Sequence, residues 1–98
     1  MTIISNGTAA TSQGDKYIRQ LIKHWGHKFE TSYEEGVGTV PFAPDAIARL
    51  TSDAASLRIE LQTPDAEGAT ALRGVIERHV DRFAFREAPL SYAWEPLL

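Results

Sequence analysis

The chain has 98 residues, with 10 Lys+Arg, 13 Asp+Glu, three His and no Cys, and its formal net charge is -3 at pH 7. This length fits one domain, residues 1–98, and the lack of cysteine excludes disulfides, thiolate metal sites and cysteine nucleophiles. The acidic balance disfavours a nucleic-acid-binding protein, and no apolar run reaches the roughly 20 residues of a membrane helix. Because the N-terminal residues also lack the pattern of a signal peptide, the expectation is a cytoplasmic domain without membrane contact.

The first predicted elements are a strand and a helix. Residues 3–11 favour a strand, and the pair Asn6-Gly7 predicts a turn or bulge inside it. Ser12, with an acid three positions later, predicts the start of a helix, and Gly26 predicts its end. The apolar side chains between these ends recur at helical spacing and form one face: Tyr17, Ile18, Leu21, Ile22 and Trp25.

Four strands are predicted next. Alternation of side chains over residues 27–33 predicts the first of them, and a turn leads to a short second strand over residues 39–42. Pro41 within that strand indicates a sheet edge or a bulge. Residues 46–51 fit a strand or a single helical turn, and a strand is favoured. Residues 57–61 alternate most clearly of all.

A second helix and a C-terminal tail complete the chain. The helix follows Thr63-Pro64-Asp65, and its apolar face consists of Ala69, Leu72, Val75, Ile76, Val80 and Phe83. Its opposite face, predicted to point to water, carries Arg73, Glu77, Arg78 and Asp81. In the tail Leu90, Tyr92 and Trp94 alternate, which predicts aromatic side chains laid back onto the body. The order β-α-β-β-β-β-α predicts an α+β fold, an antiparallel sheet of four to five strands with both helices packed on one face.

The three histidines are the first candidates for a binding site. His24 lies at the boundary of the first helix's apolar face, His27 begins the following strand, and His79 lies within the apolar stripe of the second helix. If the helices pack side by side, His79 approaches His24, and the three imidazoles form a metal-ligand set. The alternative, favoured because this spacing is no zinc signature, is that His79 bonds a carbonyl or a carboxylate in the core. His24 and His27 then only occupy a helix C-terminus, where cations are favoured.

Charge is unevenly distributed along the chain. Residues 16–28 carry four basic side chains and no acid, a local +4, whereas the rest carries 6 basic and 13 acidic residues, or -7. This asymmetry favours an anionic ligand or an acidic partner, and its alternative is a solvated polar helix face. Arginines 78, 82 and 86 add a second basic ridge, where three neighbouring acids predict a surface charge network, namely Glu77, Asp81 and Glu87.

The common catalytic templates are missing from the sequence. It contains no G-x-S-x-G elbow, no Walker phosphate loop and no G-x-G-x-x-G fingerprint. An enzyme that uses a histidine as general base also needs a carboxylate to orient the ring, and the sequence places none at a telling spacing. An enzyme is therefore the least favoured class.

Two stretches of the chain carry a resemblance to a known family. They are residues 23–28, Lys-His-Trp-Gly-His-Lys, and residues 79–87, His-Val-Asp-Arg-Phe-Ala-Phe-Arg-Glu, followed by a tryptophan. Together they resemble a small bacterial family known only as a domain of unknown function, whose members occur alone or fused to or encoded beside siderophore-interacting, flavin-dependent ferric reductases. A thiol that precedes the first lysine in the family is replaced here by Ile22. The resemblance implies eight positions to test first: His24, His27, His79, Arg82, Phe83, Arg86, Glu87 and Trp94.

Two hypotheses of function follow. The first is an accessory or binding domain linked to iron or siderophore handling, whose ligand is a metal ion or an iron–siderophore complex. Its candidate ligand-binding residues are His24, His27, Lys28, His79, Arg82, Arg86 and Trp94, and its candidate metal ligands are His24, His27 and His79. The second is a structural interaction module with no ligand of its own, which docks to a siderophore-interacting reductase or forms a homodimer.

Overall fold

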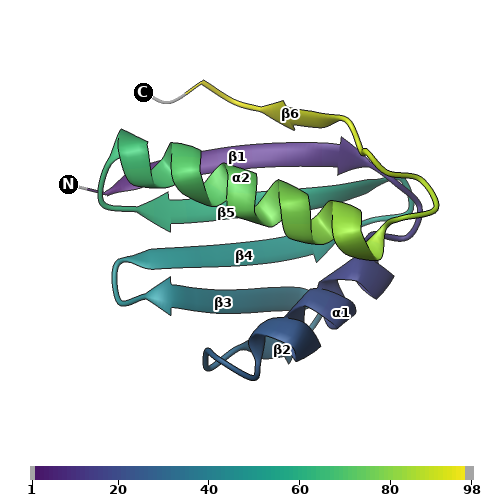
Figure 1. The fold of residues 1–98 in the computed structure, drawn as a ribbon, viewed down its shortest axis with the longest axis horizontal. Coiled ribbons are helices and arrows are strands. Elements are labelled where there is room, and N and C mark those ends of the chain that lie inside the picture. The colour runs from purple at the N-terminus through teal and green to yellow at the C-terminus, as the bar shows by residue number, and fades with distance from the viewer. Residues whose placement is uncertain (1, 97–98) are drawn as a thin grey trace.

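The structure, a computed structural model, describes residues 2–96. Its helices and strands, in chain order, are β1 (Ile3–Ala10), α1 (Gly14–Trp25), β2 (Ser32–Glu34), β3 (Val37–Ala43), β4 (Ala46–Ser52), β5 (Ser56–Thr63), α2 (Ala66–Phe83) and β6 (Tyr92–Trp94). The strands form one antiparallel sheet in the order β2-β3-β4-β5-β1-β6, and both helices lie on the same face of it (Figure 1). The predicted α+β class is confirmed. Within the described residues, no helix is both long enough and apolar enough to span a bilayer.

The sheet has six strands, more than the predicted four to five, because the C-terminal tail forms a strand of its own. β6 pairs with β1 from Gly7 opposite Trp94 to Ala9 opposite Tyr92. The pairing continues one residue further, where the Glu95 amide donates to a backbone oxygen of β1 over 2.8 Å. β1 therefore lies between β5 and β6 (Figure 1). The predicted packing of the tail's aromatic side chains onto the body is confirmed, since both pack against the core.

The core lies between the sheet and the two helices. Alternate residues of β5 are buried, and so is most of the predicted apolar face of each helix, whereas Ile22, Val75 and Phe83 are half-buried. The largest apolar side chains that are almost completely buried come from three strands and both helices: Ile18, Leu21, Val40, Leu50, Leu57, Leu61, Ile76 and Val80. Burying one such side chain stabilises the fold by roughly 1.5–3 kcal/mol. This set positions the end of α1 against the middle of α2.

Both ends of α1 differ in detail from the prediction. The helix begins after Gln13 rather than Ser12, because the Thr11 hydroxyl already accepts the Gln13 amide over 3.1 Å. Gly26 is the C-terminal cap as predicted, but its φ of -63° is right-handed. A β-carbon at Gly26 would lie 2.9 Å from the backbone oxygen of Ile22. The glycine is needed here for space rather than for a left-handed turn.

Two strand predictions are wrong, and Pro41 marks a bulge. The residues after α1 continue turning, since the amides of Lys28 and Phe29 both donate to the Trp25 carbonyl, so the strand predicted over 27–33 is reduced to β2. Neither the turn nor the bulge predicted at Asn6-Gly7 is present, because β1 pairs with β5 in one unbroken register. The register of β3 against β4 shifts between Pro41 and Ala43, which confirms the predicted bulge. The strand favoured over 46–51 is confirmed as β4.

The polar face of α2, predicted to point to water, instead holds β6 in place. The Trp94 indole donates to the Glu77 carboxylate over 2.6 Å, and the Tyr92 hydroxyl donates to the Asp81 carboxylate over 2.8 Å. The Arg73 guanidinium lies 4.9 Å from the centre of the Trp94 ring. These side chains attach β6 to the helix. Within residues 2–96 neither Glu77 nor Asp81 forms an ion pair with an arginine, so the predicted surface charge network is not found there.

Glu87 is also taken out of the predicted charge network, because it bonds the start of α1. Its carboxylate accepts hydrogen bonds from the hydroxyls of Tyr17 and Thr11. Burial and the adjacent Glu87 carboxylate raise the pKa of Tyr17 to about 12, because both disfavour the phenolate. The fold therefore holds Tyr17 in its protonated form.

This raised pKa predicts a loss of stability at alkaline pH. The contribution of Tyr17 is fully present below its ordinary pKa of 10.0 and is lost as pH rises toward the folded-state value of about 12. Urea unfolding between pH 10.0 and about 12 is expected to show a steeper fall in midpoint for the wild type than for Tyr17→Phe. Parallel curves for the two proteins would contradict this assignment.

Candidate functional site

The end of α1 and the middle of α2 bring two of the three histidines together. The ring centroids of His24 and His79 lie 5.6 Å apart, which confirms the predicted approach of these two side chains. The His79 ring also lies 4.9 Å from Trp25, and the His24 ring lies 5.8 Å from Phe83 in an edge-on arrangement. The junction of the helices is therefore an aromatic cluster with two imidazoles.

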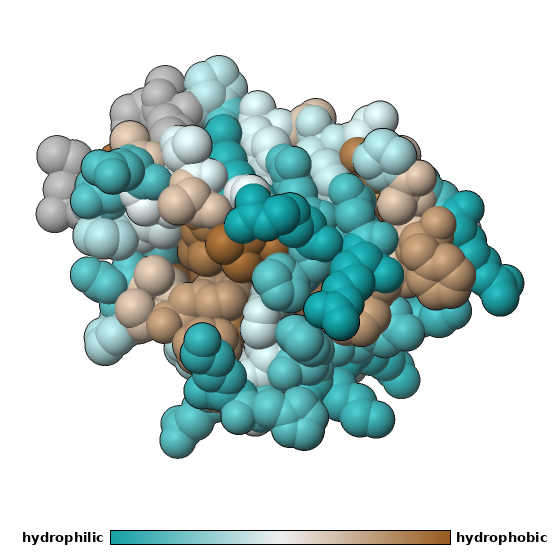
Figure 2. Space-filling view, viewed as in Figure 1, coloured by the Kyte–Doolittle hydropathy of each residue, from teal (hydrophilic) through white to brown (hydrophobic). Residues whose placement is uncertain are grey.

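A pocket of about 430 Å³ opens beside this junction. On the same face of the molecule, Figure 2 shows a hydrophobic area below α2, bordered by hydrophilic side chains. The pocket is lined by residues from α1, the turn after it, β3 and α2: His24, Trp25, Lys28, Phe29, Phe42, Val75 and His79. Its walls are mostly aromatic, and Lys28 is the single lysine or arginine among them.

The His79 ring is fixed by a backbone hydrogen bond. Its Nδ1 lies 2.7 Å from the carbonyl oxygen of Val75, one helical turn earlier. A carbonyl only accepts hydrogen bonds, so Nδ1 carries the hydrogen, and in the neutral ring Nε2 carries the lone pair. This bond confirms the alternative in which His79 is satisfied by a carbonyl, although the residue is half-buried at the pocket wall rather than enclosed in the core.

His27 does not join the other two histidines. It is exposed in the turn after α1 and does not line the pocket. Across residues 2–96 there is no group of three His, Cys, Asp or Glu side chains placed to hold a metal ion. The three-histidine metal set is therefore not formed, because the chain continues turning after Trp25 and carries His27 away from the junction.

The remaining predicted ligand-binding residues fall into two groups. Lys28 lines the pocket, and its ammonium lies 5.7 Å from the centre of the Phe29 ring. Arg82 and Arg86 are exposed and outside the pocket, and Trp94 lies on β6, attached to the polar face of α2. The structure therefore brings Lys28 to the two histidines and leaves the arginines and Trp94 apart from them.

The basic segment is less uniformly positive than its sequence indicates. Arg19 forms an ion pair of 2.8 Å with Asp15, one turn earlier, and lies over the Tyr33 ring at 5.2 Å. Asp15 lies just outside the acid-free window of residues 16–28, so counting charge within the window missed it. An exposed pair of this kind contributes little stability but removes net charge from the helix face.

Three pocket residues were missed by sequence reasoning. Phe42 lies on β3 and meets both Trp25 and Phe29 edge-on, with ring centroids 5.1 Å apart in each pair. Val75 was recognised only as part of the apolar face of α2. Their place in one pocket depends on the order of strands in the sheet, for which the sequence holds no local signal. Alternation predicts a strand at Phe29, whereas the residue lies in the turn that follows α1.

Comparison with known proteins reveals the family. Residues 6–95 match the family described as "uncharacterized protein conserved in bacteria (DUF2218)". The chain belongs to this family. It is also similar to the protein in "NMR structure of PA4090 from Pseudomonas aeruginosa", with 29% identity, a TM-score of 0.81 and 96% of each chain covered. Comparison with curated proteins gave no match.

In this DUF2218 domain the two stretches that carry the resemblance lie at the junction of the helices. The first stretch, residues 23–28, supplies His24, Trp25 and Lys28 to the pocket. The second stretch supplies His79 to the pocket and Phe83 to the ring of His24. The rest of the second stretch stabilises the fold, because its Asp81 and Glu87 carboxylates accept hydrogen bonds from the hydroxyls of Tyr92 and Tyr17. The pocket is thus where the two stretches meet.

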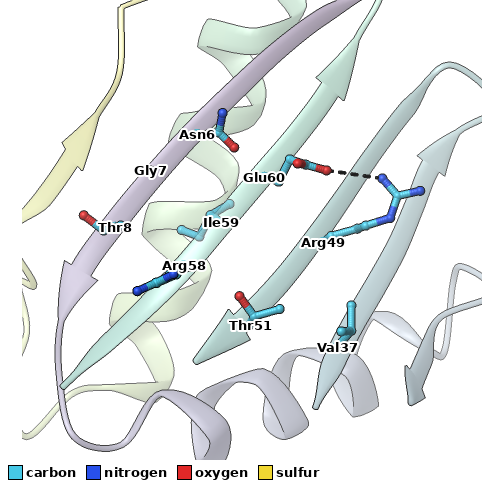
Figure 3. Close-up of a pocket in the computed structure, with 9 residues that line it drawn as sticks. All are labelled: Asn6, Gly7, Thr8, Val37, Arg49, Thr51, Arg58, Ile59 and Glu60. Atoms are coloured by element: carbon cyan, nitrogen blue, oxygen red, sulfur yellow. Dashed lines mark hydrogen bonds and ion pairs between the residues drawn. The ribbon is translucent and has the colours of Figure 1, made fainter. Parts of the chain in front are cut away.

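A second hollow, of about 350 Å³, lies on the sheet face away from the helices (Figure 3). Its charged side chains already have partners. Arg49 reaches Glu60 on the neighbouring strand at 3.5 Å, and Arg58 reaches Asp53 at 3.3 Å. The hollow has no aromatic side chain and none of the predicted site residues. The pocket between the helices is therefore the better candidate for the functional site.

Proposed function

We propose that this domain binds an anionic aromatic ligand in the pocket between its helices, and that this ligand is a catechol group of a siderophore or of its iron complex. The observation that carries the proposal is the combination of three aromatic walls, Trp25, Phe29 and Phe42, with one ammonium group and two imidazoles. Aromatic walls favour a flat ring, and the ammonium group of Lys28 favours a negative charge on that ring.

The polar groups of the pocket suit two adjacent oxygens. Lys28 donates hydrogen bonds and has no acceptor, whereas Nε2 of neutral His79 accepts one because Nδ1 is bonded to Val75. An iron-free catechol with one ionised and one protonated oxygen complements this pair. Its ionised oxygen accepts from Lys28, and its hydroxyl donates to His79. In the iron complex both oxygens are deprotonated and bound to iron, so that Lys28 and the aromatic walls alone favour it. An aliphatic carboxylate satisfies Lys28 alone and gains nothing from the aromatic walls.

The size of the pocket limits what it encloses. Its volume of about 430 Å³ is near the lower end of the range for small-molecule sites, about 300–1,000 Å³. One aromatic ring with its substituents fits this volume, so a larger siderophore inserts one ring and leaves its remainder outside. The link to iron comes from the resemblance, which also proposes a partner, a siderophore-interacting ferric reductase that receives the ligand.

The test is a titration with 2,3-dihydroxybenzoate and with its ferric complex. The chain has two tryptophans, so Trp94→Phe leaves Trp25, in the pocket wall, as the single fluorescent indole. Binding is expected to quench this fluorescence. Lys28→Ala is expected to weaken binding by about tenfold or more, because a hydrogen bond to a charged group contributes about 1.5–3 kcal/mol.

Lys23→Ala is the matched control, since Lys23 is an exposed lysine of α1 outside the pocket. It removes the same charge from the same basic segment, residues 16–28, and is expected to leave catechol binding nearly unchanged. Equal losses in the two variants would show that only general electrostatic attraction acts. If neither 2,3-dihydroxybenzoate nor its ferric complex quenches the fluorescence of Trp25, the proposed function is overturned.

A further inference from the structure

We propose that His24 and His79 together form a binding site for one divalent transition-metal ion, with copper(II) preferred. The two imidazoles come from different helices, and their ring centroids are 5.6 Å apart at the edge of the pocket. This site differs from the predicted three-histidine set, because His27 has no part in it. It shares the pocket with the proposed function and does not depend on it, since the metal alone is the ligand.

The bond between His79 and Val75 prepares one of the two ligands. A histidine that binds a metal through one ring nitrogen usually donates its other N–H to a carbonyl or carboxylate, which orients the ring and raises its basicity. The Nδ1 of His79 makes this bond at 2.7 Å, so Nε2 is left for the metal. Within residues 2–96 the single hydrogen bond of the His79 ring is the one through Nδ1.

His24 supplies the second ligand from an exposed position. Its ring lies edge-on to Phe83 at 5.8 Å and to Trp25 at 6.3 Å, and it remains open to solvent. This exposed imidazole can turn toward its partner without breaking a hydrogen bond of the fold, because its ring makes none with the rest of residues 2–96. Water completes the coordination from the open side of the pocket.

The chemistry of the pair selects the metal. Two neutral imidazoles without a thiolate or a third protein ligand suit copper, nickel and zinc, and the order of affinity among divalent ions places copper(II) first. Lys28 in the same pocket repels any cation, which lowers the affinity. This opposition separates the two proposals, because Lys28→Ala is expected to weaken catechol binding and to strengthen copper binding.

The experiment titrates copper(II) chloride into the full chain carrying Trp94→Phe. Copper(II) bound at the pair lies next to Trp25 and is expected to quench its fluorescence, and electron paramagnetic resonance of the wild type is expected to show two nitrogen ligands. His24→Ala and His79→Gln are each expected to weaken copper(II) binding by at least about tenfold. Loss of a group that only hydrogen-bonds a metal ligand already lowers metal affinity about 10–100-fold. Glutamine retains an N–H for the Val75 carbonyl, which protects the fold.

His27→Ala is the matched control and is expected to bind copper(II) as the wild type does. The proposal is overturned if either histidine variant at the junction binds with unchanged affinity, or if His27→Ala loses as much. A failure here with catechol binding intact removes the metal site alone. If copper(II) binds as expected but catechol does not bind, only the proposed function is overturned.

Discussion

Trp25→Ala is expected to lower the free energy of unfolding by about 3–5 kcal/mol, the usual cost of truncating a buried tryptophan. Trp25 is 5% exposed, ends α1, and meets both Phe42 on β3 and His79 on α2. Its removal leaves a cavity where a helix, the sheet and the second helix meet. The neighbours cannot close this cavity without moving α1.

Urea unfolding followed by circular dichroism measures this loss. Phe85→Ala is the control, because Phe85 is 72% exposed and its truncation is expected to change stability by about 0.5 kcal/mol or less. The same Trp25→Ala protein is expected to lose catechol binding. If its unfolding midpoint matches that of Phe85→Ala, Trp25 does not join the layers of the fold as described.

Gly7→Ala is expected to destabilise the protein by about 1–3 kcal/mol, as overpacking usually does. The Trp94 ring lies across Gly7, and a β-carbon there would sit 2.7 Å from two of its ring carbons. Alanine in the middle of a strand is otherwise favoured over glycine by about 0.5–1 kcal/mol. The expected loss therefore measures how firmly Trp94 and β6 are held.

A double-mutant cycle isolates this contact. In a Trp94→Ala background the ring is gone, so Gly7→Ala is expected to become neutral or to stabilise the protein. If Gly7 were needed for its own backbone conformation, Gly7→Ala would destabilise the protein in both backgrounds. A special conformation is not expected, because β1 is a regular strand at this point. Equal destabilisation by Gly7→Ala in both backgrounds would show that Trp94 is not the cause.

Local periodicity was enough to predict most of the fold. The apolar faces of α1 and α2 and the alternation in β5 are repeated several times within one element, so each is readable without its neighbours. The errors occur where a residue far along the chain decides the structure. Asn6-Gly7 predicts a turn or bulge by itself, whereas the residue that packs on Gly7, Trp94, is distant in sequence. Helical spacing directs Asp81 to water, whereas its partner Tyr92 lies on another element.

The candidate site was predictable only in part, for the same reason. Helical spacing placed His24 and His79 on faces that meet once the helices pack together, and the structure confirms this approach. The aromatic wall was not predictable, because Phe42 reaches Trp25 through the position of β3 in the sheet. His27 was grouped with the others by its nearness in sequence, although a turn separates it from them.

The position of β1 has a consequence for the order in which the chain assembles. β3, β4 and β5 are neighbours both in sequence and in the sheet, so their hairpins close short loops. β1 can pair on one side only after residues 56–63 have been made, and on the other side only after residues 92–94 have been made. Closing these long loops costs more entropy and slows folding. A growing chain thus carries its first strand with one edge open until its last strand has been made.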